Sequence, residues 1–339
     1  MTMKAMVLKA PNDLALDDVA PPQVPAGHAL VRITHSGLCG TDLKIYHGAI
    51  PAQYPLIMGH EMVGEVASEV NGGTMPGARV IIDPVLSCGT CFHCGIGQTN
   101  LCPAGGLIGR ETNGGFAEYV AVPSAQVFRL PDSIDLRIAP LIQVATTCLH
   151  AQRLGSVSVG ESVAVIGLGV SGQLHVQIAK ARGSGKVIGI SRSRFKNELA
   201  QQLGADVVIE SGPSAVAQVL EETDGRGADV VIECTGVMAS IADAIRMVRF
   251  GGRILLFGIT SAKSGDLPFY DLYFKELTLI NNRAATAQDF PVMIDLVDRG
   301  VVRLEPLVTH RMALDDLATA LGMVEDGAER RLKIILDHT

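Results

Sequence analysis

The chain has 339 residues, of which 47% are hydrophobic and 19% charged, and its formal net charge is −7. This length exceeds what one compact core usually holds, so two domains of a globular protein are expected. The acidic balance, without any basic cluster, argues against nucleic acid or an anionic membrane as a partner. No apolar run reaches the roughly 18 residues that would span a bilayer.

The chain up to about residue 150 carries short alternating or apolar runs broken by Gly and Pro, which predict an irregular β-rich domain. The first segment, "MTMKAMVLKAPNDLAL", alternates like a strand and has no apolar core of signal-peptide length, so a cytoplasmic location is expected. Further strands are predicted within "ALVRITHSG", "MVGEVASEV", "ARVIIDPV" and "FAEYVAVP".

Four of the seven cysteines lie within "SCGTCFHCGIGQTNLC": Cys88, Cys91, Cys94 and Cys102. Disulfides, an iron–sulfur cluster and a tetrahedral zinc site could each explain such a group. Cytoplasmic thiols usually stay reduced and seven is an odd number, so disulfides are disfavoured. The two metal-centre explanations remain open on the residues alone.

From about residue 152, short apolar runs alternate with helix-like stretches such as 172–182 and 195–204, which predicts a parallel, doubly wound sheet. The chain then continues through two predicted helices, 289–300 and 314–327. A final strand at 332–337 is expected to return to the first domain. The strands of the parallel sheet are predicted at 162–167, 186–191, 205–210, 228–236, 252–258 and 277–282.

The segment "VAVIGLGVSGQ" places Gly167, Gly169 and Gly172 in the spacing G-x-G-x-x-G, after an apolar strand and before a helix. The first glycine permits a tight turn, the second lets the backbone approach a pyrophosphate, and the third lets the helix pack against the strand. Free N–H groups at the helix start then bind the anion. We assign the intervening Leu168 and Val170 to the same loop.

A dinucleotide site usually has an acidic ribose reader about 20 residues further on. Here Ser191 stands 19 residues after Gly172, followed by Arg192, Arg194 and Lys196. A missing carboxylate and several cations suit a 2′-phosphate, so NADP is the expected cofactor and NAD the alternative. Solvated surface charge is the other explanation for these cations.

Two upstream motifs complete a family resemblance: "HSGLCGTDLK", with Cys39, Thr41 and Asp42, and "LIMGHEMVGEV", with His60 and Glu61. Together with the cysteine cluster, "NGGFAEYV", "GLGVSG" and the terminal "LKIILD", they resemble the zinc-dependent medium-chain dehydrogenase/reductase family, in the family's order and over nearly the whole chain. Within it, the chain is similar to polyol, sugar and secondary-alcohol dehydrogenases and to threonine dehydrogenases.

The resemblance implies a GroES-like catalytic domain of residues 1–151 and 286–339, and a Rossmann-type dinucleotide-binding domain of residues 152–285. It also implies that the four clustered cysteines hold a structural zinc. A ferredoxin-like cluster is disfavoured because its fourth Cys follows after three residues, whereas here seven intervene. A homo-tetramer or a homodimer is implied as well.

For the reactive zinc, the resemblance implies Cys39 and His60 as ligands, Glu61 as a ligand or alternate ligand, and Gln143 at a position where relatives usually have Cys, Glu or Asp. Asp42 would orient the histidine. Thr41 would relay the substrate proton, and Lys44 stands where many relatives have the next histidine of the relay. Arg283, Lys333, Thr235 and Gly258 are assigned to the cofactor.

The expected function is therefore hydride transfer between a nicotinamide cofactor and a sugar, polyol or secondary alcohol. A threonine 3-dehydrogenase-like activity or an NAD-linked polyol dehydrogenase is the nearest alternative. A zinc-free quinone reductase would lack both "GHE" and the cysteine lobe. A non-enzymatic binder of zinc and nucleotide on the same fold would be expected to lose a reactive-site residue, and Gln143 and Lys44 are the departures that hint at it.

Overall fold

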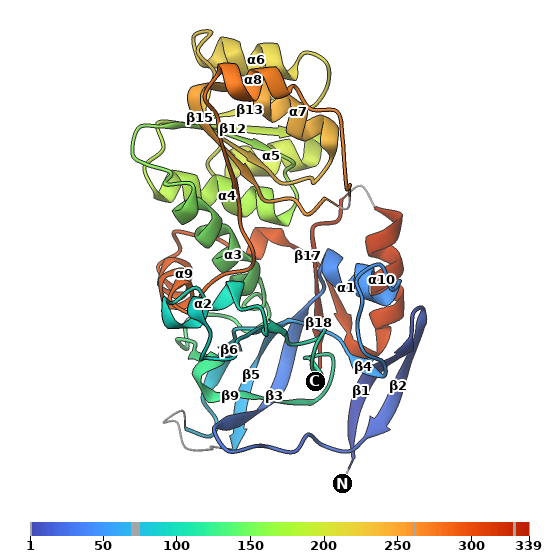
Figure 1. Ribbon diagram of the computed structural model, residues 1–339. Coiled ribbons are helices and arrows are strands. Elements are labelled where there is room, and N and C mark those ends of the chain that lie inside the picture. The colour runs from blue at the N-terminus through green and yellow to red at the C-terminus, as the bar shows by residue number, and fades with distance from the viewer. Residues whose placement is uncertain (1, 69–74, 261, 328–329, 339) are drawn as a thin grey trace. The chain divides into compact units, whose positions relative to one another are not determined.

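The computed structural model describes residues 2–68, 75–260, 262–327 and 330–338, and the chain divides into two compact units (Figure 1). Unit 1 comprises Met1–Val144, Thr286–Asp298 and Leu304–Thr339, and unit 2 comprises Ala145–Ala285 and Arg299–Arg303. Among the described residues, no helix combines the length and the apolar character that crossing a bilayer would require.

Unit 1 is built on two main antiparallel-rich sheets. In the first, β1 (Met3–Ala10) pairs with β2 (Asp13–Val19) and with the short β4 (Leu56–Ile57). The second has the order β10-β6-β5-β3-β18-β17, and β9 also pairs with β3. Its strands are β3 (His28–Gly37), β5 (Glu61–Ser68), β6 (Arg79–Ile82), β9 (Tyr119–Pro123), β10 (Val127–Arg129), β17 (Val308–Ala313) and β18 (Lys333–Asp337).

The C-terminal strand returns to unit 1, as the sequence predicted. β18 runs antiparallel to β3, with Ile335 opposite Gly37, and parallel to β17. All three elements contribute to the same sheet although nearly 300 residues separate β3 from β18. The helices of this unit are α1 (Gly40–Tyr46), α2 (Phe92–Gly95), α9 (Asp289–Asp298) and α10 (Leu317–Asp326), and the start of α3 (Leu141–Leu154) belongs to it.

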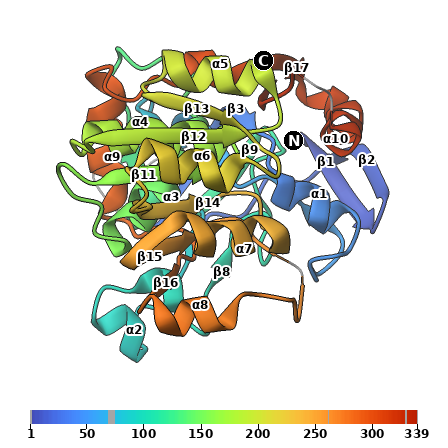
Figure 2. The same cartoon turned by 90° about the horizontal axis from the view of Figure 1, so that it is seen from above.

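Unit 2 contains a six-stranded parallel sheet of order β13-β12-β11-β14-β15-β16, whose strands lie side by side in Figure 2. In chain order this is 3-2-1-4-5-6, the arrangement of dinucleotide-binding Rossmann folds, so the predicted doubly wound sheet is confirmed. The strands are β11 (Ser162–Ile166), β12 (Lys186–Ser191), β13 (Val207–Glu210), β14 (Ala228–Glu233), β15 (Val248–Leu256) and β16 (Thr278–Asn281).

Successive residues of β11 enter two different cores, one on each face of the sheet. Val163 and Val165 pack in a cluster with residues of α4 (Val170–Ala181) and α5 (Arg194–Gln202). Ala164 and Ile166 pack in a second cluster with residues of α6 (Ala215–Glu222) and α7 (Met238–Met247). Burial on both faces explains why the sequence shows continuous apolar runs rather than strict alternation.

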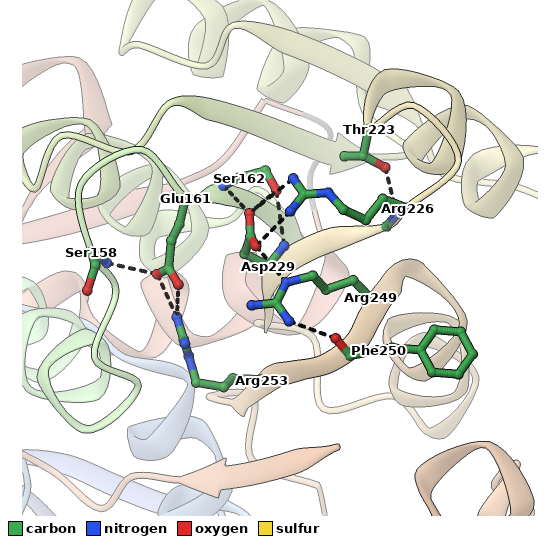
Figure 3. A network of polar contacts seen from close by, with 10 residues as sticks. Ser158, Glu161, Ser162, Thr223, Arg226, Asp229, Arg249, Phe250 and Arg253 are labelled. Carbon is green, nitrogen blue, oxygen red and sulfur yellow. Dashed lines mark hydrogen bonds and ion pairs between the residues drawn. The ribbon is translucent and has the colours of Figure 1, made fainter. Parts of the chain in front are cut away.

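The amino ends of β11 and β14 are held together by a polar network, drawn in Figure 3. Asp229 accepts hydrogen bonds from the backbone N–H of Ser162 at 2.8 Å and from its hydroxyl at 2.7 Å, and pairs with Arg249 at 2.6 Å. Burial raises the pKa of Asp229, but these donors outweigh it and lower the pKa to about 2. Glu161 pairs with Arg253 nearby at 2.5 Å. The network lies at the amino ends of the strands. In such folds, ligands bind at the opposite edge of the sheet, outside the carboxyl ends.

Candidate functional site

A turn between β3 and α1 places Cys39 and Asp42 close together. Cys39 is the N-cap residue of α1, with an extended backbone conformation (φ −112°, ψ 153°). The Asp42 carboxylate accepts the Cys39 N–H at 2.9 Å, which satisfies a donor that the helix leaves unpaired. Asp42 is fully buried, so its second oxygen needs another partner.

His60 provides that partner. Its Nδ1 lies 3.2 Å from Oδ1 of Asp42, and both side chains are buried. Burial disfavours the charged imidazole, but Asp42 and the neighbouring Cys39 outweigh it and raise the pKa of His60 well above its usual value. Asp42 therefore fixes the ring orientation of His60 and the start of α1 at once.

Glu61 opens β5 and lies opposite Gly37 in the antiparallel pair of β3 and β5. A Cβ on Gly37 would come within 2.1 Å of Glu61 Oε2, so the carboxylate occupies space that only glycine leaves free. This register brings together strands that are distant in sequence. As a result, one ligand atom from each of Cys39, His60 and Glu61 lies within 4.8 Å of the others.

The buried ammonium of Lys333 neutralises Glu61. Its Nζ donates to both Glu61 oxygens at 2.7 Å and to the carbonyl of Leu38 at 3.0 Å. Burial lowers the pKa of Lys333, but Glu61 outweighs this effect and raises it above the ordinary value. All three ammonium protons thus have acceptors within unit 1 in this structure. No pattern in the sequence indicated this ion pair, and the assignment of Lys333 to the cofactor phosphates stays a prediction.

Three other residues assigned to the reactive zinc site lie on helices of unit 1. Thr41 and Lys44 are half-buried on α1, and Gln143 is buried in the first turn of α3. Their roles as proton relay and metal ligand stay predictions. A thiolate, an imidazole and a carboxylate are donors that catalytic zinc sites use, so the group of Cys39, His60 and Glu61 fits that metal.

The four clustered cysteines converge in a lobe whose base is the pair of β7 (Val85–Leu86) and β8 (Gly106–Leu107). Sγ–Sγ distances are 3.5 Å for Cys91–Cys94, 3.8 Å for Cys91–Cys102 and 4.0 Å for Cys88–Cys94. A tetrahedron with Zn–S bonds of about 2.3 Å has edges of about 3.8 Å, whereas a disulfide requires about 2.05 Å. The cluster therefore fits a closed zinc site, and none of these cysteines is disulfide-bonded.

The thiols of this lobe differ in acidity. A backbone hydrogen bond from Thr90, with its hydroxyl, lowers the pKa of Cys88 to about 6. Cys91 accepts the Cys94 N–H, which lowers its pKa, but burial and the adjacent thiols raise it to about 11. Four crowded thiols cannot all ionise without a cation among them, so the donor set calls for a divalent metal.

In unit 2, an added Cβ would meet a different environment at each of the three glycines of the dinucleotide loop. Gly167 adopts φ +92°, and a Cβ there would lie 2.5 Å from Cγ2 of Thr235. A Cβ on Gly172 would lie 2.0 Å from the carbonyl oxygen of Gly167. Gly169 is the N-cap of α4, and an added Cβ there would meet open space, which leaves room for a ligand. Leu168 is buried and Val170 is half-buried.

The residues assigned to the ribose lie at the end of β12. Ser191 is buried, and its hydroxyl oxygen accepts the N–H of Ser193 at 3.2 Å. Arg192 is exposed, whereas Arg194 pairs with Glu198 at 2.7 Å. Lys196 is half-buried, and its carbonyl accepts a hydrogen bond from the Gln173 amide.

Thr235 and Gly258 lie in the loops after β14 and β15, and Arg283 is exposed just after β16. Glu233, the last residue of β14, forms hydrogen bonds with the loops after β14 and β15. It was not predicted as a site residue from the sequence. The available signal was a carboxylate that ends the apolar run "ADVVIE".

Comparisons with known proteins agree with this geometry. The family model for the alcohol dehydrogenase GroES-like domain matches residues 25–132, and the model for the zinc-binding dehydrogenase matches residues 170–299. The L-threonine 3-dehydrogenase of Pyrococcus abyssi is 34% identical over 332 residues, which cover 95% of this chain and 94% of that protein. The L-galactonate-5-dehydrogenase of Escherichia coli is 31% identical over 323 residues, 94% of each chain.

Two solved structures carry bound nicotinamide cofactors. A zinc-binding dehydrogenase from Sinorhizobium meliloti bound to NADP has a TM-score of 0.93 and 31% identity, with 100% of both chains covered. The short chain alcohol dehydrogenase RspB from Escherichia coli CFT073, complexed with NADH, has a TM-score of 0.92 and 29% identity, with 99% of both chains covered. The chain therefore belongs to the zinc-dependent medium-chain dehydrogenases and is an oxidoreductase that transfers hydride between an alcohol and a nicotinamide cofactor.

Proposed function

We propose that Cys39 and His60 hold the reactive zinc, that Glu61 or Gln143 completes its shell, and that the substrate is a sugar, polyol or secondary alcohol. The observation that carries this proposal is the group of half-buried Cys39 and buried His60 and Glu61, whose ligand atoms lie within 4.8 Å of one another. Zinc bound there would polarise the substrate oxygen and favour its alkoxide form. Residues 1–151 and 286–339 would supply this chemistry, and residues 152–285 would bind the cofactor.

The surrounding side chains would position ligands and move a proton. Asp42 holds the ring of His60, with Nδ1 and Oδ1 3.2 Å apart. Thr41 would receive the hydroxyl proton of the substrate, and Lys44 stands three residues further along the same helix. Residues three apart on a helix are surface neighbours, so Lys44 is suitably placed for the next step of the relay.

Metal content and turnover of purified protein test the assignment. Wild type should hold two zinc ions per chain, and His60→Ala should lose one zinc ion and all turnover while still binding the cofactor. The matched control is Cys148→Ala, because Cys148 is a buried thiol of α3 outside both metal groups. It should keep both zinc ions. A His60→Ala variant with full zinc content and normal turnover would remove His60 from the reactive site.

A panel of alcohols with each cofactor separates the candidate substrates. Polyols, sugars and secondary alcohols should be oxidised. L-threonine is included because the L-threonine 3-dehydrogenase of Pyrococcus abyssi is 34% identical to this chain. Turnover of L-threonine alone would favour the threonine dehydrogenase alternative. A protein that binds zinc and nucleotide but oxidises nothing on the panel would favour a binding role.

Self-association is also proposed, as a homodimer or a tetramer. The helix α8 (Phe269–Phe274) exposes large apolar side chains, with Tyr273, Tyr270 and Phe269 exposed to 82%, 71% and 66%. The neighbouring strand β16 pairs only with β15 among the described strands, and Thr278–Asn281 contains no Lys or Pro to protect its open edge. Exposed aromatic surface and an open edge both favour pairing with a second copy about a twofold axis.

Sedimentation of wild type and of a Tyr273→Glu variant tests this surface. Wild type should sediment as a dimer or tetramer and the variant as a smaller species. A monomeric wild type would contradict the proposal. We also propose a cytoplasmic location, because thiolate zinc sites require reduced cysteines, which that compartment maintains.

A further inference from the structure

Glu233 is a fully buried carboxylate at the end of β14. Its side chain accepts hydrogen bonds from the Thr235 N–H at 2.8 Å, the Gly236 N–H at 2.9 Å and the Thr235 hydroxyl. Among the described residues, no Lys, Arg or His forms an ion pair with it. Burying an unpaired carboxylate is costly, so three donors and no cation are an unusual arrangement for a purely structural position.

The backbone of Glu233 holds a second loop. Its carbonyl oxygen accepts the N–H of Phe257 at 2.9 Å and the N–H of Gly258 at 2.8 Å. A Cβ on Gly258 would come within 2.1 Å of the Gly236 nitrogen, so the two loops are in direct contact. One residue therefore fixes the loops that follow β14 and β15.

The turn at Thr235 lies against the first glycine of the dinucleotide loop. Its Cγ2 occupies the space that a Cβ on Gly167 would need, 2.5 Å away. The N–H of Cys234 also donates to the carbonyl of Ile166 at 2.9 Å, which ties the carboxyl ends of β14 and β11 together. The strand order reverses between these two strands, and dinucleotides bind in the crevice at such a point.

The hydroxyl of Thr235 has both of its roles filled inside the protein. It donates to Glu233 and accepts the N–H of Val237 at 3.0 Å. Thr235 was assigned to the cofactor from the sequence, but its hydroxyl proton faces Glu233 and its methyl group faces Gly167. Thr235 therefore shapes the turn through these contacts, and its assignment to the cofactor stays a prediction.

We propose that Glu233 is a positioning residue for the nicotinamide cofactor. It holds Thr235 and Gly236 in the conformation that forms one wall of the crevice beside Gly167, so that the loop is ordered before the cofactor arrives. This inference rests on the proposed function, because it assumes that a dinucleotide binds at the carboxyl ends of β11 and β14.

The test compares cofactor binding in Glu233→Gln, Thr235→Val and the double variant, by fluorescence titration with NADPH and with NADH. Losing a charge-assisted bond should raise the cofactor Kd by about tenfold in Glu233→Gln. The kcat at saturating cofactor and the zinc content should stay close to wild type. The control is Glu210→Gln, which also ends a strand of this sheet but is exposed, and should leave the Kd unchanged.

The double variant decides whether Glu233 acts through Thr235. If it does, the Kd of the double variant equals that of the weaker-binding single variant, whereas additive effects would overturn the proposal. Thr235→Val keeps the volume of the side chain, so this variant tests the proposal if Glu233→Gln fails to fold. An unchanged cofactor Kd in Thr235→Val overturns the proposal. A lower melting temperature in either variant without any change in Kd would show a structural role only. Wild type that binds neither cofactor would refute the proposed function itself and this inference with it.

Discussion

We expect the enzyme to prefer NADP over NAD, and replacing Arg192 by Ala should reduce this preference. Arg192 directly follows β12, is exposed, and forms no ion pair or hydrogen bond with another described residue. Arg194, by contrast, is already paired with Glu198 at 2.7 Å. Ser191 is small and neutral at the position where NAD enzymes carry a carboxylate. Arg192 is therefore the cation that is free to contact a 2′-phosphate.

The size of the effect follows from the exposure of this side chain. A hydrogen bond to a charged group contributes about 1.5–3 kcal/mol, and salt screens an exposed pair, so we take the lower end of this range. About 1.5 kcal/mol corresponds to roughly a tenfold change. We expect kcat/KM with NADP to fall by about this factor in Arg192→Ala, while kcat/KM with NAD stays nearly unchanged.

The assay measures kcat/KM with both cofactors at low and high salt. Arg194→Ala is the matched control, because it removes another exposed guanidinium of the same segment that already has a partner, and its cofactor ratio should match wild type. The effect of Arg192→Ala should shrink as salt rises. Equal or better use of NAD by wild type would refute the reasoning, as would an unaltered ratio in Arg192→Ala.

Four further predictions concern the metal sites and a buried acid. Cys88→Ser should lose one zinc ion per chain and melt at a lower temperature, since structural zinc contributes folding energy; full zinc content in the variant, or iron in wild type, would contradict the assignment. Lys333→Met should cost about 3–5 kcal/mol of unfolding free energy by leaving Glu61 unpaired, and adding Glu61→Gln should recover much of it; additive losses in denaturant titrations would rule out the pair. Gln143→Glu should resist chelators better and turn over more slowly than wild type, and no change in either property would remove Gln143 from the neighbourhood of the metal. Burial raises the pKa of Asp83 to about 7, so the folded state keeps a proton that the unfolded state releases above about pH 4. The free energy of unfolding of wild type should therefore fall as pH rises towards 7, by up to about 4 kcal/mol. The stability of Asp83→Asn relative to wild type should increase between pH 5 and pH 8. A difference in stability that stays constant over this range would exclude this titration.

The parallel sheet of unit 2 could be predicted from the sequence because each strand is buried on both faces and reads as a continuous apolar run. The prediction of β12 at 186–191 is confirmed, residue for residue. The start of β15 was missed, since the strand begins at Val248 and not at residue 252. Its first residues include the half-buried Arg249, the exposed Phe250 and two glycines, so no apolar pattern indicates them.

The grouping of the metal-site residues could not be predicted from spacing alone. Twenty-one positions separate Cys39 from His60, and only the antiparallel register of β3 and β5 brings them together. The resemblance to a family supplied that information. Lys333 reaches Glu61 across 272 positions through the pairing of β18 with β3, and no local pattern in the sequence indicates such a contact.

The charges around Cys39 suggest why a neutral glutamine is tolerated at position 143. Without metal, the charges of Asp42 and Glu61 are balanced by Lys333 and by protonated His60, whose pKa is raised. A zinc ion that replaced one proton on Cys39 and one on His60 would leave the net charge of the group unchanged. The free-energy cost of desolvating a buried group is lowest when its charges cancel. A third acidic residue at position 143 would leave one negative charge unbalanced in both states, whereas the amide of glutamine would offer a donor atom without adding charge. The same balance explains why Lys333 is buried beside Glu61: without this cation, the acidic residues of the group would outnumber its cationic partners.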